Sequence, residues 1–102
     1  MSAIELQSST YFEWDEAKSE ACLVRRGFDF AYALRAFGDP KRLVVLDDRL
    51  DYGEIRYRLL GGINGRVFCI AFTFRSGAIR IISARKANYR EVARYEDSSR
   101  QS

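Results

Sequence analysis

Residues 80–87 read Arg-Ile-Ile-Ser-Ala-Arg-Lys-Ala, a run of apolar residues interrupted by cations. The isoleucines favour a strand, and the Ser-Gly pair at 76–77 is typical of a turn just before it. Residues 88–97 contain neither glycine nor proline, so a helix can follow at once. The sequence therefore predicts a strand at 78–85 that passes directly into a C-terminal helix, at a point where burial and positive charge meet.

Further strands are predicted upstream of this stretch. Apolar and charged residues alternate through 54–61, which predicts a strand with one buried face. The Asn-Gly pair at 64–65 is a strong hairpin signal, and the nearly continuous apolar run at 66–75 suits the centre of a sheet. Together with 78–85 these segments predict an antiparallel meander of three strands, to which a short strand at 43–46 adds a fourth.

Two helices are predicted before the sheet. Asp15 is suited to cap a helix that runs to about Arg26, with one inward-facing stripe of small or branched residues. The stripe consists of Ala17, Ala21 and Val24. A second helix, capped by Asp29, should run to Phe37, because its apolar residues follow the i, i+3, i+4, i+7 spacing. We therefore expect a single α+β domain over 1–102, with an ordered core at about 12–97.

The composition limits the class of protein. A chain of 102 residues suffices for one core, and its 47% hydrophobic and 14% aromatic content argues for a packed globule. The apolar runs are too short to cross a bilayer, and the first ten residues do not look like a secretory or transit segment. These features predict a cytoplasmic protein that does not associate with a membrane.

Positive charge is concentrated toward the C-terminus, although the net charge is only +3. Residues 1–38 hold four Lys or Arg and six Asp or Glu, residues 39–74 six and five, and residues 75–102 seven and three. This gradient is typical of a surface that meets a polyanion. A solvated basic tail would produce the same gradient, so charge alone leaves both interpretations open.

The chain contains no histidine, which narrows the chemistry available to it. Cys22 and Cys69 fall in a predicted helix and a predicted strand, and we expect both to be buried, reduced thiols. Two distant cysteines without histidine cannot assemble a transition-metal site, and no clustered Asp and Glu motif points to Mg²⁺. We therefore expect neither a metal nor another cofactor.

Arginines are out of phase with the buried residues on two of the predicted strands. Arg56 and Arg58 alternate with the apolar set on one strand, and Arg80 alternates with isoleucines on the other. If both strands turn the same face to the helices, these three side chains form a cationic patch suited to bidentate contacts with phosphate. From alternation alone, an ordinary charged outer face is the simpler interpretation.

Glu54 and the residues of the last helix lie near these cations in the sequence, and each has two possible roles. Glu54 lies two residues before Arg56 on the same face, where it could be a surface ion-pair partner or a general base. The last helix has too few apolar positions to be deeply buried. Its exposed surface, including Tyr95, could therefore face RNA or a partner.

Landmarks in a fixed order run along nearly the whole chain. They are Phe12-Glu13-Trp14-Asp15, Lys18, Gly27, Phe30, Ala33, Phe37, Asp39-Pro40, Gly53-Glu54, Arg56, the 80–87 stretch, Glu91 and Tyr95-Glu96. In this order they resemble the BrnT family of bacterial toxins over roughly residues 12–96. Two positions depart from the usual pattern, because Cys22 stands where Asn is common and Arg26 where a His commonly precedes the glycine.

The resemblance carries implications for fold and partners. It implies a compact α+β ribonuclease toxin with a RelE-like sheet, neutralised by a cognate antitoxin. In that family the antitoxin is BrnA-like and has a ribbon-helix-helix DNA-binding part, so the toxin would meet operator DNA only through the antitoxin. RNA would be the substrate, and neither a membrane nor a cofactor is implied.

A ribonuclease without a metal uses the 2′-hydroxyl of the RNA as nucleophile, and it needs a proton acceptor and cations for the charge on phosphorus. The expected catalytic residues are Arg56, Arg80, Arg85, Lys86, Glu54 and Tyr95, and the expected RNA-binding residues are Arg58, Arg90 and Arg94. The cations would act electrostatically, and Glu54 or Tyr95 would transfer the proton. The alternative is a non-catalytic module whose basic sheet face binds nucleic acid or an acidic protein.

Overall fold

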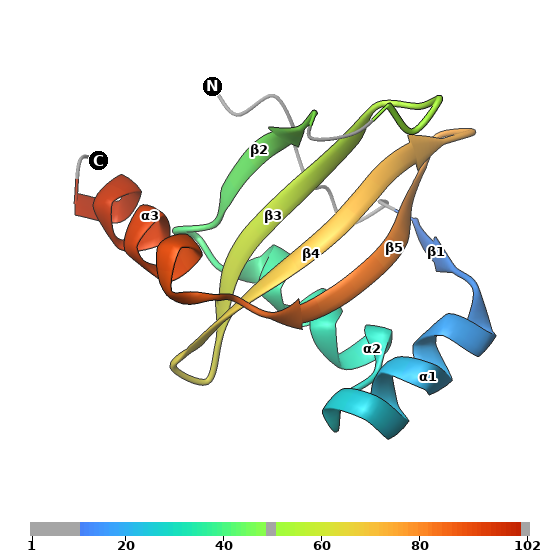
Figure 1. Cartoon of the computed structure of the whole chain (residues 1–102), viewed down its shortest axis with the longest axis horizontal. Coiled ribbons are helices and arrows are strands. Elements are labelled where there is room, and N and C mark those ends of the chain that lie inside the picture. Colours follow the sequence, from blue (N-terminus) through green and yellow to red (C-terminus); the bar gives the residue numbers. More distant parts are fainter. Residues whose placement is uncertain (1–10, 49–50, 101–102) are drawn as a thin grey trace.

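The computed structural model describes residues 11–48 and 51–100 (Figure 1). In chain order its elements are β1 (Phe12–Trp14), α1 (Glu16–Arg26), α2 (Phe30–Ala33), the 3-10 helix η1 (Leu34–Gly38), β2 (Leu43–Asp47), β3 (Arg56–Ile63), β4 (Arg66–Arg75), β5 (Ala78–Lys86) and α3 (Tyr89–Arg100). The predicted α+β class is confirmed. The C-terminal helix continues to Arg100, beyond the expected limit of the ordered core at residue 97.

The strands form one five-stranded mixed sheet in the order β1-β5-β4-β3-β2. The antiparallel meander of β3, β4 and β5 is confirmed, and β2 pairs antiparallel with β3 as its fourth strand. The prediction of a purely antiparallel sheet is wrong, because β1 pairs in parallel with β5 through Phe12 opposite Ile79. Three residues are too few to show an alternation, so β1 was not recognisable as a strand.

The two hairpins depend on turn residues with left-handed backbone conformations. Asn64 and Gly65 have φ angles of 50° and 81°, and Ser76 and Gly77 have φ angles of 52° and 82°. Positive φ at both central residues matches the right-handed twist of the flanking strands, which is why Asn-Gly is so strong a hairpin signal. The two predicted turns therefore set the register of β4 against both of its neighbours.

Helix α1 begins and ends as predicted but faces the core differently. Oδ1 of Asp15 accepts hydrogen bonds from the backbone N–H groups of residues 17 and 18 at 2.9 and 3.2 Å, and Gly27 ends the helix with a φ of 86°. The buried residues are Ser19 and Cys22, whereas Val24 is 85% exposed. The predicted inward stripe of Ala17, Ala21 and Val24 is therefore wrong. The helix contacts β5 through the neighbouring stripe, where the Cys22 thiol donates to the carbonyl of Ala84 at 3.4 Å.

The predicted second helix is in fact two short helices. Only α2 is α-helical, and the chain then tightens into η1. The tight turn lies against β3 at Gly61, where an added Cβ would stand 2.4 Å from the carbonyl oxygen of Ala36. Close approach of the two backbones is possible because Gly61 has no side chain.

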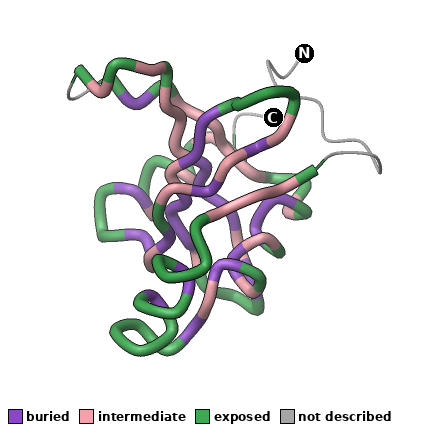
Figure 2. The backbone as a smooth tube through the Cα atoms, turned by 90° about the vertical axis from the view of Figure 1, so that its right-hand side faces the viewer, coloured by how far each residue is buried: buried purple, intermediate pink, exposed green. Residues whose placement is uncertain are grey.

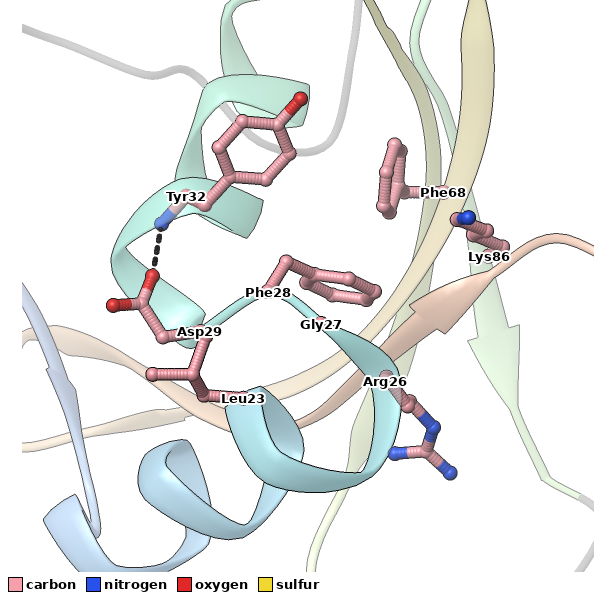
Figure 3. A pocket seen from close by; sticks show the side chains of 8 residues that line it. All are labelled: Leu23, Arg26, Gly27, Phe28, Asp29, Tyr32, Phe68 and Lys86. Carbon is pink, nitrogen blue, oxygen red and sulfur yellow. Dashed lines mark hydrogen bonds between the residues drawn. The ribbon is translucent and has the colours of Figure 1, made fainter.

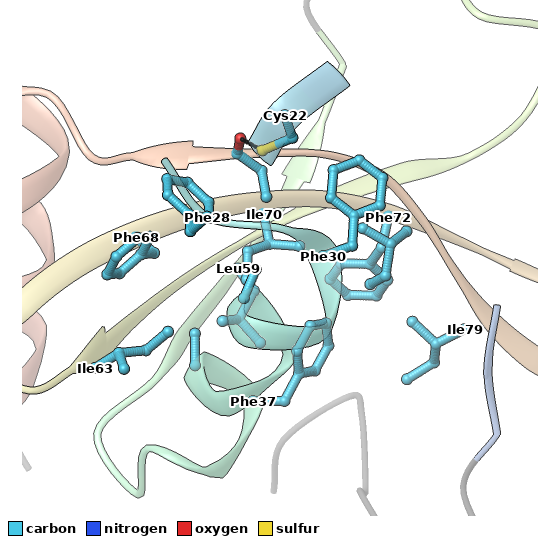
Figure 4. Close-up of a cluster of buried hydrophobic side chains, with 14 residues drawn as sticks. Cys22, Phe28, Phe30, Phe37, Leu59, Ile63, Phe68, Ile70, Phe72 and Ile79 are labelled. Atoms are coloured by element: carbon cyan, nitrogen blue, oxygen red, sulfur yellow. Dashed lines mark hydrogen bonds between the residues drawn. The ribbon is translucent and has the colours of Figure 1, made fainter. Parts of the chain in front are cut away.

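The hydrophobic core lies between one face of the sheet and α1, α2 and η1. Figure 4 shows Leu59 and Ile70 of the central strands among phenylalanine rings that include Phe30, Phe37 and Phe72. Figure 2 shows the buried stretches of backbone inside the molecule and exposed stretches at its turns. Helix α3 stands apart from the other helices, beside β3 (Figure 1). Much of the opposite face of the sheet is therefore available to carry polar side chains.

Candidate functional site

The strand register places four arginines on the sheet face opposite α1 and α2. Tyr57, Phe72 and Ile81 stand in one row across β3, β4 and β5 and pack in or against the core. Their neighbours along each strand point to the other face, because side chains alternate. Those neighbours include Arg56, Arg58 and Arg80, and Arg85 lies on the same face opposite Cys69. The expected gathering of Arg56, Arg58 and Arg80 on one face is thus confirmed.

Glu54 lies at one end of this face between two arginines. Its carboxylate oxygens are 3.2 Å from Nε of Arg56 and 3.2 Å from Nη2 of Arg75, while its side chain remains 28% exposed. The hydrogen bond from Arg75, followed by that from Arg56, keeps the pKa of Glu54 below its usual value against the opposing effect of desolvation. The guanidinium of Arg56 also lies 4.0 Å from the ring centre of Tyr52. Glu54 is therefore an ionised, accessible carboxylate beside fixed cations.

Arg80 extends this cluster across the sheet. It stands opposite Thr73 of β4 and, on the other side, beside Glu13 of β1, whose Oε1 is 3.4 Å from Nη1 of Arg80. Because strands lie about 4.8 Å apart, Arg56 and Arg80 are separated by two strand spacings, or about 10 Å at the backbone. Their long side chains could reach phosphate oxygens of one nucleotide.

A second cluster surrounds Glu91 at the start of α3. Its oxygens are 2.7 and 2.9 Å from the two terminal nitrogens of Arg85, and Oε2 is also 3.1 Å from Nη1 of Arg58. Glu91 and Asn88 form a capping box, in which each side chain accepts the other residue's backbone N–H, at 2.8 and 2.9 Å. Burial alone would raise the pKa of Glu91, but the hydrogen bonds from Arg85 and Asn88 outweigh it and lower the pKa to about 2.

Both cysteines are buried and free, as expected. Cys69 lies on β4 beside the Glu91 cluster, and burial, together with its contact with Glu91, raises the pKa of this thiol to about 11. A thiol in this state is a weak nucleophile. Cys69 is therefore a protonated thiol at neutral pH that packs beside the cluster.

Lys86 lies on the opposite side of β5 from its neighbour Arg85, because successive strand residues alternate. It stands opposite Phe68 and is exposed. At the end of the strand the two cations nevertheless line one shallow pocket of about 300 Å³ together with Arg26 and Phe28. Lys86 thus faces a different part of the surface from Arg56 and Arg80.

Tyr95 is placed where its hydroxyl anchors α3. It donates to Oδ2 of Asp39, which also accepts the backbone N–H of Gly62 at 2.7 Å. Burial, and then the hydrogen bond to Asp39, raise the pKa of Tyr95 to about 12. Burial by itself would raise the pKa of Asp39, but the hydrogen bonds from Tyr95 and from backbone N–H groups lower it overall. Arg90 and Arg94 lie exposed on the same helix.

The structure therefore divides the predicted catalytic residues into separate groups. Arg80 and Arg85 are five residues apart on β5, about 16 Å along the strand, so one scissile phosphate cannot lie at both backbone positions. Glu54 precedes the start of β3, whereas Tyr95 contacts the region of Gly62 near its end. The two residues proposed for proton transfer are thus at opposite ends of the sheet.

Sequence reasoning missed some members of the clusters. Arg75 joins Glu54 through the β3–β4 pairing, and no local pattern marks it. Glu91 was noted only as a landmark, yet Asn88-x-x-Glu91 has the spacing of a capping box and could have located the start of α3. Arg26 was treated as a departure from a family pattern, and its Nη1 donates to the carbonyl of Ala84 at 3.3 Å.

The described parts of the chain contain neither a candidate metal-binding cluster nor a candidate membrane-spanning helix. Across residues 11–48 and 51–100, no group of three or more His, Cys, Asp or Glu side chains could hold a metal ion. Over the same ranges, no helix has both the length and the apolar character needed to span a bilayer.

Comparison with protein families gives a match over most of the chain. Residues 14–91 match the family described as the ribonuclease toxin, BrnT, of type II toxin-antitoxin systems. The matched region begins at Trp14 in β1 and ends at Glu91, so it contains the whole sheet from β2 to β5 and both arginine clusters. In a comparison with curated proteins, no relative matches the chain. Since the family match extends over well more than half of its residues, the chain belongs to the BrnT family of ribonuclease toxins.

Proposed function

We propose that this protein is an endoribonuclease that cleaves RNA without a metal at the cluster formed by Glu54, Arg56, Arg75 and Arg80. The observation that carries the proposal is the Glu54 carboxylate, which contacts two guanidinium groups and remains partly exposed. A carboxylate of this kind can accept a proton while the cations beside it stabilise charge on phosphorus. The absence of histidine from the sequence makes a carboxylate the natural proton acceptor.

The reaction is an attack within the RNA itself. Glu54 takes the proton of a 2′-hydroxyl, whose oxygen forms a bond to the adjacent phosphorus as the bond to the 5′-oxygen breaks. The leaving 5′-oxygen takes a proton from water, so the products are a 2′,3′-cyclic phosphate and a 5′-hydroxyl. Arg56, Arg75 and Arg80 stabilise the additional negative charge that develops on the phosphoryl oxygens.

The remaining predicted residues act away from the scissile phosphate. Glu91 holds Arg85 and Arg58 in fixed positions, where they add positive charge to the surface that meets the RNA backbone. Arg90 and Arg94 add exposed positive charge on α3, and Lys86 adds it on the other side of β5. Tyr95 stays protonated at neutral pH and serves to attach α3 to the sheet, since its hydroxyl donates to Asp39.

A type II system implies an antitoxin partner. In this proposal the antitoxin is a ribbon-helix-helix protein that neutralises the toxin in the cytoplasm, and it brings the toxin to operator DNA. The support is the family membership together with the basic C-terminal third of the sequence, which an acidic segment could cover.

The test is cleavage of a defined RNA by the purified protein in excess EDTA, with identification of the products. Cleavage should persist, should leave a 2′,3′-cyclic phosphate or its hydrolysis product, and should not occur in the 2′-O-methyl RNA. Glu54→Gln should reduce the rate about 10²-fold or more, and Glu96→Gln on the exposed side of α3 should not change it. Loss of activity in EDTA would overturn the metal-free mechanism, and RNA binding without any cleavage would favour the non-catalytic module.

A further inference from the structure

A pocket of about 500 Å³ opens beside the last residues of β5, away from the Glu54 cluster (Figure 3). It is lined by Leu23, Arg26, Gly27, Phe28, Asp29, Tyr32, Phe68 and Lys86. These residues come from the end of α1, the loop that follows it, α2, and the hairpin end of the sheet. The volume lies in the range of pockets that hold a small organic ligand.

The floor of this pocket is aromatic. The ring centres of Phe28 and Phe68 are 5.0 Å apart, and Tyr32 lies 6.2 and 6.0 Å from them. Figure 3 shows the three rings around one space. Both phenylalanines are buried and meet edge to face at 89°, whereas Tyr32 is partly exposed, so a flat ligand would stack on Tyr32 rather than on all three rings.

The rim of the pocket is cationic. Lys86 stands beside Phe68, and Arg26 reaches β5 through its bond to the Ala84 carbonyl. The adjoining 300 Å³ pocket shares Arg26, Phe28 and Lys86 and adds Arg85. Asp29 is the one carboxylate among the described residues that line the two pockets, and one of its oxygens already accepts the backbone N–H of Tyr32 at 2.9 Å.

An aromatic floor with two cations at its rim, and with Arg85 in the adjoining pocket, combines the two features that bind a nucleotide of single-stranded RNA. Aromatic rings stack on a base of any identity, and cations contact the phosphate that follows it. An acidic peptide from a protein partner would pair with the cations, but it would place no flat group against the aromatic floor. The observations therefore favour a nucleotide over an acidic peptide.

We propose that this pocket is an RNA subsite, in which one base stacks on the partly exposed Tyr32 ring beside Phe28 and Phe68, while Lys86 and Arg26 bind the adjacent phosphate and Arg85 adds positive charge from the adjoining pocket. Phe68 and Arg75 are seven residues apart on β4, so the subsite lies roughly 20 Å from the Glu54 cluster. The subsite thus holds a nucleotide several positions away from the one that is cleaved, and its role as a substrate subsite rests on the proposed ribonuclease function.

The experiment measures binding separately from cleavage. Fluorescently labelled 2′-O-methyl hexanucleotides lack the attacking hydroxyl, so their anisotropy with the full-length protein reports affinity alone. Matched hexamers without bases test whether the pocket recognises a base. The variants are Lys86→Ala, with Lys41→Ala as an exposed control, and Tyr32→Leu, which removes the aromatic face but keeps an apolar side chain. Thermal melting verifies that each variant is folded.

We expect wild-type protein to bind the hexamers with bases about tenfold more tightly than those without them, and Tyr32→Leu to abolish that preference. Lys86→Ala should weaken the binding of both hexamers and reduce the salt dependence of their affinity by about one phosphate contact. Lys41→Ala should do neither. Equal affinity for the two hexamers would overturn the base subsite. Unchanged RNA affinity in folded Lys86→Ala and Tyr32→Leu, with weaker binding of the antitoxin, would assign the pocket to the antitoxin instead.

The two proposals can fail independently. If wild-type protein does not cleave RNA but shows the base preference, the subsite stands as a nucleotide-binding site and the ribonuclease mechanism fails. If cleavage occurs at the same rate in wild-type, Tyr32→Leu and Lys86→Ala proteins and no base preference is seen, the mechanism stands and the subsite fails.

Discussion

Arg85 and Glu91 form a bidentate ion pair, in which the two terminal nitrogens of the guanidinium lie 2.7 and 2.9 Å from the two carboxylate oxygens. The pair joins the end of β5 to the first turn of α3. Glu91 is 7% exposed and also accepts a hydrogen bond from Nη1 of Arg58. One buried carboxylate therefore fixes the positions of arginines from two strands, β3 and β5. The position of α3 and the geometry of both arginines therefore depend on the same side chain.

Replacing Glu91 should destabilise the protein strongly. Glu91→Gln leaves Arg58 and Arg85 without their carboxylate and weakens the capping box, and we expect a loss of about 2–4 kcal/mol in the free energy of unfolding. Urea unfolding followed by circular dichroism measures it. Glu96→Gln, on an exposed position of the same helix, should change stability by less than about 0.5 kcal/mol. A similarly small effect at Glu91 would show that the pair contributes little.

The same residue should make stability depend on acid pH. The pKa of Glu91 is about 2 in the folded protein against a reference of 4.5, so its contribution is complete above about pH 4.5 and is lost as pH falls toward 2. A difference of this size corresponds to about 3 kcal/mol. The stability difference between wild type and Glu91→Gln should therefore shrink between pH 5 and pH 2 in urea titrations. A constant difference over that range would contradict the lowered pKa.

Substitutions of the arginines on the sheet face should fall into two groups, those that reduce cleavage and those that reduce stability. Arg56→Ala, Arg75→Ala and Arg80→Ala should each reduce RNA cleavage about 10²-fold, because each removes a cation near Glu54. Their ion pairs are partly exposed, so stability should change by less than about 1 kcal/mol. Single-turnover cleavage and urea unfolding measure the two effects.

Arg85→Ala should behave in the opposite way. It should lower the free energy of unfolding substantially, because it leaves buried Glu91 with fewer partners, and it should reduce the cleavage rate less than the other three substitutions do. Arg100→Ala is the control, since Arg100 is 73% exposed near the end of α3. If the alanine variants of Arg56, Arg75, Arg80 and Arg100 all lost the same small amount of cleavage activity, the arginines would only attract RNA and would not take part in catalysis.

Gly61 should not tolerate a side chain. In Gly61→Ala the new methyl group would meet the Ala36 carbonyl at 2.4 Å, so η1 and β3 would have to move apart. We expect a loss of about 2 kcal/mol or more, measured by thermal and urea unfolding. Gly38→Ala is the matched control, because the added methyl group there meets nothing within 4 Å. Equal stability of the two variants would show that the close approach is unimportant.

Expression of the protein alone in a bacterium should arrest growth, because uncontrolled cleavage of RNA stops protein synthesis. Co-expression of the cognate antitoxin should restore growth, and Glu54→Gln should be tolerated at the same level of soluble protein. Growth curves together with immunoblots measure this. Unimpaired growth with verified soluble wild-type protein would contradict a toxin function for this chain.

Local sequence determined the regular parts of this fold. The Asn-Gly turn at 64–65 and the Ser-Gly turn at 76–77 fix two hairpins, because their backbone angles select the turn type within a few residues. Asp15 and Gly27 likewise mark the two ends of α1 through contacts inside the helix itself. Alternation also predicted that Arg56, Arg58 and Arg80 lie out of phase with the buried residues of their own strands, since this depends only on the pleat of each strand. That the three share one face required both strands to turn the same side to the helices.

Tertiary structure decided what each of these residues contacts. The parallel pairing of Phe12 with Ile79 and the ion pair between Glu13 and Arg80 connect positions 67 residues apart, and no local pattern specifies them. The core-facing stripe of α1 was also set by its contact with β5 rather than by its own sequence. Turns and caps form between residues a few positions apart, so their chemistry is visible in the sequence. The partner of an arginine, and the site to which it belongs, depend on which distant segments are brought together when the chain closes around its core.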